Sequence, residues 1–158
     1  MKAASLAELK KELKTLPASD LLDLCMRLAK YKKDNKELLT YLLYEAGNEQ
    51  AYIDAIKEEM DEQFSELNTS NGYLAKKGLR KILRSTTKYC KHSGLVETEI
   101  DLLLYACKKM KASPVYKFMT TNAVLNNIYV QQVKKIDKAL GKLHEDLQFD
   151  YKQQLERL

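Results

Sequence analysis

The chain has 158 residues and a formal net charge of +5 at pH 7, from 27 Lys and Arg against 22 Asp and Glu. Its 45% hydrophobic content, with 5 Gly and 2 Pro, excludes a disordered or collagen-like protein. The three cysteines cannot form a fully paired disulfide framework, and no stretch approaches the roughly 18 uninterrupted apolar residues of a membrane-spanning helix. The N-terminus runs directly into charged helix instead of an apolar signal core. We therefore expect an intracellular, cytoplasmic protein without a membrane segment, folded as one domain over residues 1–158.

Helix-forming residues dominate the composition. Leucine far outnumbers valine and isoleucine, and Leu, Ala, Lys and Glu all favour helix. No segment alternates strictly between apolar and polar residues with turn residues at both ends. The sequence therefore predicts an all-α fold of about seven helices in successive antiparallel hairpins, either an irregular bundle or a short superhelix.

The N-terminal part contains several helix boundaries. Residues 5–8 (Ser-Leu-Ala-Glu) and 34–37 (Asp-Asn-Lys-Glu) both match the capping-box pattern at the start of a helix. Pro17 ends the first helix, and Ser19 is placed to cap the second. Gly47 is placed to follow the C-terminus of the third.

Further amphipathic helices are expected over about residues 49–67, 73–91 and 97–111. Residues 68–72 (Asn-Thr-Ser-Asn-Gly) form the clearest loop. Ser113-Pro114 then opens a long C-terminal helix within the segment 114–158.

A weak internal similarity links residues 19–47 to residues 80–108. Leu21-Leu22 and Leu42-Leu43-Tyr44 in the first segment correspond to Ile82-Leu83 and Leu103-Leu104-Tyr105 in the second. A duplicated and stacked helix pair produces such a pattern. The layout over about residues 19–113 resembles the helical hairpins of HEAT-like repeat proteins, a resemblance of architecture that assigns no functional residue.

The segment 73–91 carries a face of positive charge, the most informative feature of the sequence. At about 100° per residue, its cations lie on one side of a helix and its apolar residues on the other, and residues 73–92 contain no carboxylate. Such a face can neutralise several phosphates of a nucleic acid with little sequence preference. The candidate anion-binding or partner-binding residues are Lys77, Arg80, Lys81, Arg84, Lys88 and Lys91.

An acidic face on the preceding helix, residues 49–67, offers another explanation for these cations. If the two helices form an antiparallel hairpin, the acidic and basic faces lie side by side, and the cations are neutralised within the fold or by a second copy. Three interpretations therefore stay open: internal or solvated charge, a protein partner and a nucleic acid.

The C-terminal segment contains an apolar series at spacings of three and four residues, as in a coiled-coil seam. A long helix packed along its own domain explains this series, and so does a protruding helix that pairs with a second copy. The candidate helix-pairing residues are Val133, Ile136, Leu140, Leu143 and Leu147.

The sequence lacks the usual patterns of catalysis and metal binding. Neither His92 nor His144 belongs to an HExxH or Cys/His ligand pattern, and there is no glycine-rich phosphate loop. The cysteines fall on apolar faces, where they act as small buried hydrophobes. We expect no catalytic residue, metal ligand or cofactor, and hence a non-catalytic interaction or scaffold protein that binds a protein partner or a second copy. The alternative is a nucleic-acid-binding module that uses the basic face of residues 73–91.

Overall fold

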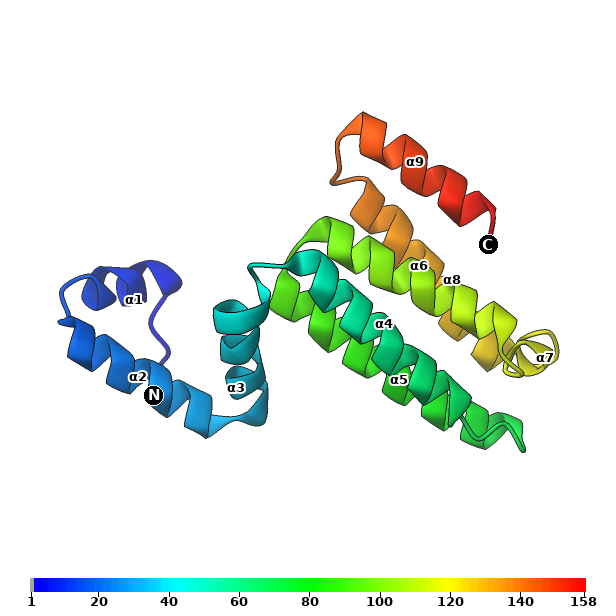
Figure 1. The fold of residues 1–158 in the computed structure, drawn as a ribbon, viewed down its shortest axis with the longest axis horizontal. Coiled ribbons are helices and arrows are strands. Elements are labelled where there is room, and N and C mark those ends of the chain that lie inside the picture. Colours follow the sequence, from blue (N-terminus) through cyan, green and yellow to red (C-terminus); the bar gives the residue numbers. More distant parts are fainter. Residues whose placement is uncertain (1) are drawn as a thin grey trace. The chain divides into compact units, whose positions relative to one another are not determined.

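A computed structural model of the chain describes residues 2–158 (Figure 1). These residues form nine α-helices and one π-helix and contain no β-strand, which confirms the predicted all-α class. Contacts within the chain divide it into two compact units, unit 1 up to Tyr44 and unit 2 from Glu45 to Leu158. This division is finer than the single domain expected from the length.

Unit 1 contains three α-helices and most of a π-helix: α1 (Leu6–Leu13), α2 (Ala18–Tyr31), α3 (Lys33–Thr40) and η1 (Tyr41–Glu45). Helix α1 begins at its predicted capping box. The Ser5 hydroxyl accepts a hydrogen bond from the backbone N–H of Glu8, and the Glu8 carboxylate accepts one from the backbone N–H of Ser5.

The other two predicted N-caps of unit 1 are wrong. Helix α2 begins one residue before Ser19, because Pro17 (φ −67°, ψ 159°) already has the extended backbone of an N-cap. Helix α3 begins at Lys33, after an extended Lys32, and no side chain caps it. Asp34 therefore lies inside the first turn, where its carboxylate complements the helix dipole instead.

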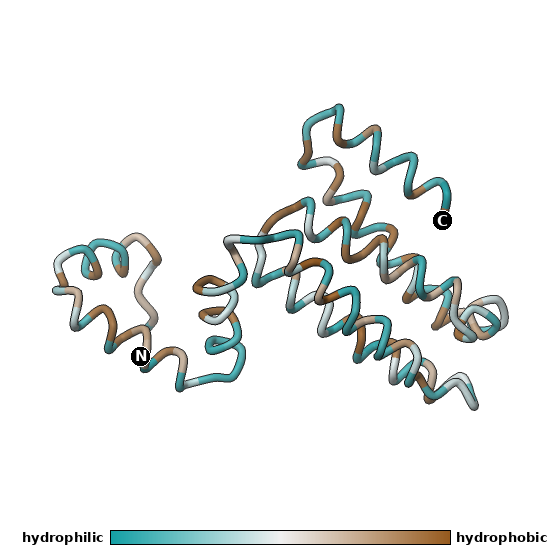
Figure 2. Tube along the Cα trace, in the orientation of Figure 1, coloured by the Kyte–Doolittle hydropathy of each residue, from teal (hydrophilic) through white to brown (hydrophobic). Residues whose placement is uncertain are grey.

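The apolar residues of unit 1 are only partly covered. No residue of α1, α2 or α3 is buried, and Figure 2 shows apolar residues recurring along α2 and α3. Helix α2 packs against α3, and Cys25, Leu28 and Leu38 line a hollow between them. Leu22 and Leu28 are 62% and 60% exposed. The helices of unit 1 thus present an apolar face instead of enclosing a core.

Unit 2 contains six α-helices: α4 (Glu49–Ser65), α5 (Gly72–Ser93), α6 (Val96–Ala112), the short α7 (Tyr116–Met119), α8 (Ala123–Leu140) and α9 (Glu145–Glu156). Helix α6 is central, since it packs against α4, α5 and α8 (Figure 1). Eight of its 17 residues are buried. Helix α5 differs from it, because α5 buries one face and leaves its cations on the other.

Asparagine side chains and a glycine fix both ends of α5 and the start of α8. The Asn71 side chain accepts a hydrogen bond from Leu74 N–H at the start of α5, and the Asn122 side chain accepts one from Val124 N–H at the start of α8. Helix α5 ends at Gly94, whose φ of 70° lies in the left-handed region that only glycine adopts without steric cost.

The C-terminal segment expected to form one long helix is divided into α7, α8 and α9. The interruption between α8 and α9 spans residues 141–144. Gly141 lowers helix propensity there. The His144 imidazole then caps α9, because it accepts a hydrogen bond from the backbone N–H of Asp146.

The apolar series of this segment lies mostly in the core of unit 2. Ile136 and Leu140 belong to a buried cluster shared with α6, and Val133 and Leu143 are partly buried against the same cluster. Leu147, on α9, is 41% exposed. Packing within unit 2 therefore accounts for the three-four spacing of these residues.

The similarity between residues 19–47 and 80–108 joins helices of unequal length and burial. Helix α2 has 14 residues and α5 has 22. Ile82 and Leu83 are buried, whereas the corresponding Leu22 is 62% exposed. A duplication of the helix pair stays a prediction.

The internal packing of α8 predicts unequal costs for truncating two residues of the apolar series. Ile136→Ala should lower the free energy of unfolding by about 2–5 kcal/mol, because it leaves a cavity in the core. Leu147→Ala, the partly exposed control, should lower it by only about 1 kcal/mol or less. Urea unfolding followed by circular dichroism measures both. Equal losses, with a midpoint that rises with protein concentration, would instead indicate pairing of this series between copies.

Candidate anion-binding groove

The six predicted cations of α5 form a face that is open to solvent. Lys77, Arg80, Lys81, Arg84 and Lys91 are exposed, and Lys88 is half-buried. The Lys88 ammonium lies 5.5 Å from the centre of the Tyr89 ring, in cation–π geometry. The face forms because α5 buries its opposite side, which includes Ala75, Leu79, Ile82, Leu83, Thr86 and Cys90.

Within residues 2–158, no carboxylate lies within 4.0 Å of the charged groups of the five exposed cations. Two acidic residues of α4 have other partners. Asp61 forms an ion pair with Lys109 of α6 at 2.9 Å and accepts a hydrogen bond from the Tyr105 hydroxyl at 2.7 Å. These two contacts, the Lys109 bond above all, lower the pKa of Asp61. Glu59 accepts a hydrogen bond from the Tyr89 hydroxyl. Direct neutralisation by α4 therefore does not explain the five cations.

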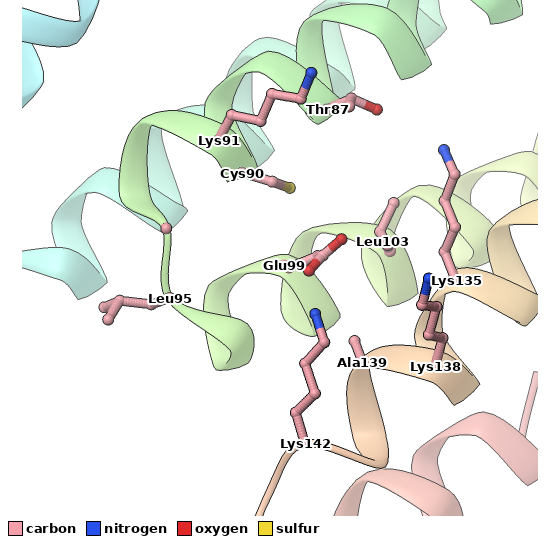
Figure 3. Close-up of a pocket in the computed structure, with 11 residues that line it drawn as sticks. Thr87, Cys90, Lys91, Leu95, Glu99, Leu103, Lys135, Lys138, Ala139 and Lys142 are labelled. Carbon is pink, nitrogen blue, oxygen red and sulfur yellow. The ribbon is translucent and has the colours of Figure 1, made fainter. Parts of the chain in front are cut away.

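Helix α8 brings a second set of lysines towards the same side of α5. Two adjoining hollows lie between the two helices, and both are lined by Thr87 and Lys135. One hollow, of about 410 Å³, also has Lys91, Lys138 and Lys142 around it (Figure 3). The other, of about 340 Å³, also has Arg80, Arg84, Asn127 and Gln131 around it. We call the two hollows together the α5–α8 groove.

The two walls of the groove run in the same direction along the chain. Arg80 and Arg84 of α5 share one hollow with Gln131 of α8, and Lys91 shares the other with Lys138. From Arg80 to Lys91 the helix rises roughly 17 Å, at about 1.5 Å per residue. This length corresponds to about five steps of a nucleic-acid strand at 3.4 Å each. The groove can therefore hold several phosphates of one base-stacked strand.

The structure does not bring all six cations of α5 to this groove. Lys77 and Lys81 line a different hollow, between α4 and α5, together with Glu66. Arg84 lies at the border and lines both. The face predicted as one unit is thus divided between two sides of α5, and three of its cations face α8.

The lysines that form the second wall of the groove were not predicted from the sequence. Lys135 and Lys138 lie three residues apart on α8, and Lys142 follows four residues later, just beyond the end of the helix at Leu140. This spacing of three and four is the one that places residues on the same side of a helix. The predictions for this segment concern only its apolar series. A basic series beside an apolar one is the signal that could have identified the second wall.

The cysteines of unit 2 are unsuited to nucleophilic chemistry. Burial raises the pKa of Cys90 to about 12, with a further contribution from the Glu99 carboxylate. Burial raises the pKa of Cys107 to about 12 as well. Both thiols are therefore protonated at neutral pH, and the thiolate is the reactive form. Cys25, in unit 1, is exposed.

No cluster of His, Cys, Asp and Glu side chains in residues 2–158 is arranged to hold a metal ion. Over the same residues, no helix is both long and apolar enough to cross a bilayer. Comparison with known protein families, curated proteins and solved structures finds no match.

Proposed function

We propose that this chain is a non-catalytic binding protein whose α5–α8 groove holds the phosphate backbone of a nucleic acid. The observation that carries the proposal is the set of exposed cations without carboxylate partners, described above, which faces a second row of lysines across a groove. Unpaired cations held close together repel one another and gain most from a ligand that carries several negative charges.

The composition of the groove favours a polyanion bound mainly through its backbone. Six cations line it: Arg80, Arg84, Lys91, Lys135, Lys138 and Lys142. Their neutralisation by phosphates releases counterions, which gives an affinity that falls steeply with salt. Asn127 and Gln131 add amide groups at one end, where they can hydrogen-bond to phosphates or bases. Little sequence preference is expected, because backbone contacts carry no base information.

The proposal predicts a steep salt dependence and a loss of binding on charge reversal. If all six cations contact phosphates of a single strand, the slope of log K against log salt should be about −4. The double variant R80E/R84E should weaken binding at least about tenfold and make this slope shallower by about one or more. Fluorescence anisotropy of a labelled single-stranded oligonucleotide, titrated at several salt concentrations, measures both effects.

A matched control has the same change in net charge away from the groove. Lys134 of α8 and Lys152 of α9 are exposed and line neither hollow. The double variant K134E/K152E should therefore keep most of the affinity. Equal losses in the two double variants would show that only overall charge matters, and absence of binding by the wild type at low salt would exclude the proposed function.

Unit 1 favours a second candidate function, self-association as a scaffold. A folded unit of about 40 residues generally needs another surface to complete its hydrophobic core. Helices α1, α2 and α3 contain no buried residue, and α2 exposes Leu22, Leu24, Met26 and Leu28. A second copy would supply a matching apolar face, since each copy carries the same residues in the same arrangement.

This second candidate predicts a molecular mass that rises with concentration. Sedimentation velocity of the full chain should show a dimer, and Leu22→Glu should shift the equilibrium towards monomer, because it puts a charge into the buried contact. Arg27→Glu, an exposed substitution on the same helix, should leave the equilibrium nearly unchanged. A strict monomer at every concentration would exclude self-association without affecting the groove.

A further inference from the structure

One carboxylate lies among the cations of the α5–α8 groove. Glu99, in the first turn of α6, is half-buried and lines the larger hollow. Figure 3 shows its carboxylate near the middle of this hollow, with Lys142 reaching towards it and Lys135 and Lys138 farther along α8. Among the described residues, none places a cationic nitrogen within 4.0 Å of the Glu99 oxygens.

A carboxylate in this position is unfavourable for a ligand that presents only phosphates. Two negative charges at about 4 Å repel each other by about 1 kcal/mol in water and by more where water is partly excluded. The charge of Glu99 acts inside the hollow, since it adds to the raised pKa of Cys90 across from it. The ligand that suits the site therefore carries hydrogen-bond donors close to its phosphates.

Ribose supplies such a donor beside each phosphate. The 2′-hydroxyl of RNA donates a hydrogen bond, and it is the group by which proteins distinguish RNA from DNA. We propose that the α5–α8 groove is selective for RNA, with Glu99 accepting a hydrogen bond from a ribose 2′-hydroxyl while the surrounding lysines bind the adjacent phosphates. This inference rests on the proposed function, because it names the class of nucleic acid bound in the same groove.

The position of Glu99 also has a structural explanation. A variant of a neighbouring residue can test it. Carboxylates in the first turn of a helix are stabilised by the helix dipole. Glu97 lies in the same turn of α6 but lines neither hollow, and its charge acts instead on Asp101 and Tyr151. Glu97→Gln therefore removes a comparable helix-dipole contribution without changing the groove.

The test compares three ten-nucleotide strands that share the uracil base and differ only at the 2′ position. These are uridine, deoxyuridine and 2′-O-methyluridine oligomers, and the last one keeps the 2′ oxygen but loses its donor. The wild-type chain should bind the uridine strand about tenfold more tightly than the other two. Glu99→Ala should abolish this preference and should strengthen binding of the deoxyuridine strand, because the repulsion is gone. Glu97→Gln should leave the preference unchanged.

The outcomes separate this inference from the function on which it rests. If the wild type binds all three strands equally and with a steep salt dependence, RNA selectivity is excluded and backbone binding stands. If the wild type binds none of them, both proposals fail. A preference that survives Glu99→Ala would assign selectivity to another residue and overturn the role of Glu99. The comparison of strands on the wild type alone decides the selectivity even if a variant fails to fold.

Discussion

The burial of α6 is the constraint on which the groove depends. Its buried residues face α4, α5 and α8, so the apolar sides of these three helices are fixed by contact with it. With α5 and α8 both held on α6, their outward faces border a common groove. The cations of the two walls repel each other across it, and the apolar packing beneath them keeps the walls together. The groove therefore exists because the core holds α5 and α8 against α6.

The same packing draws one acidic residue of α4 away from the cations of α5. The acidic residues of α4 were expected to face the basic residues of α5, but Asp61 is engaged by α6 through Lys109 and Tyr105. Helix α6 thus takes up part of the negative charge that would otherwise neutralise α5. An exposed ion pair contributes only about 0–1 kcal/mol to stability. The absence of ion pairs between α4 and the exposed cations of α5 therefore costs the fold little.

The sequence was informative where local chemistry decides the structure. The cap at Ser5 and the amphipathic character of α5 follow from residues close together in the chain. The sequence was less informative where distant residues meet. It placed Arg80 and Lys91 on one helix face, but their neighbours Lys135 and Lys138 are more than 40 residues away, and their proximity depends on how α8 packs on α6. The apolar series around Ile136 fitted both internal and intermolecular packing, because both bury the same spacing.

The most direct test of the account measures each lysine separately. Trace acetylation of the folded chain, with and without a bound uridine oligomer, gives a rate for every lysine by mass spectrometry. If the groove binds the phosphate chain between its walls, Lys91 of α5, Lys135 and Lys138 of α8 and Lys142 just after α8 should be protected together, while Lys134 and Lys152 keep their rates. Protection of Lys91 without the lysines of α8, or a uniform slowing of all lysines, would contradict the account.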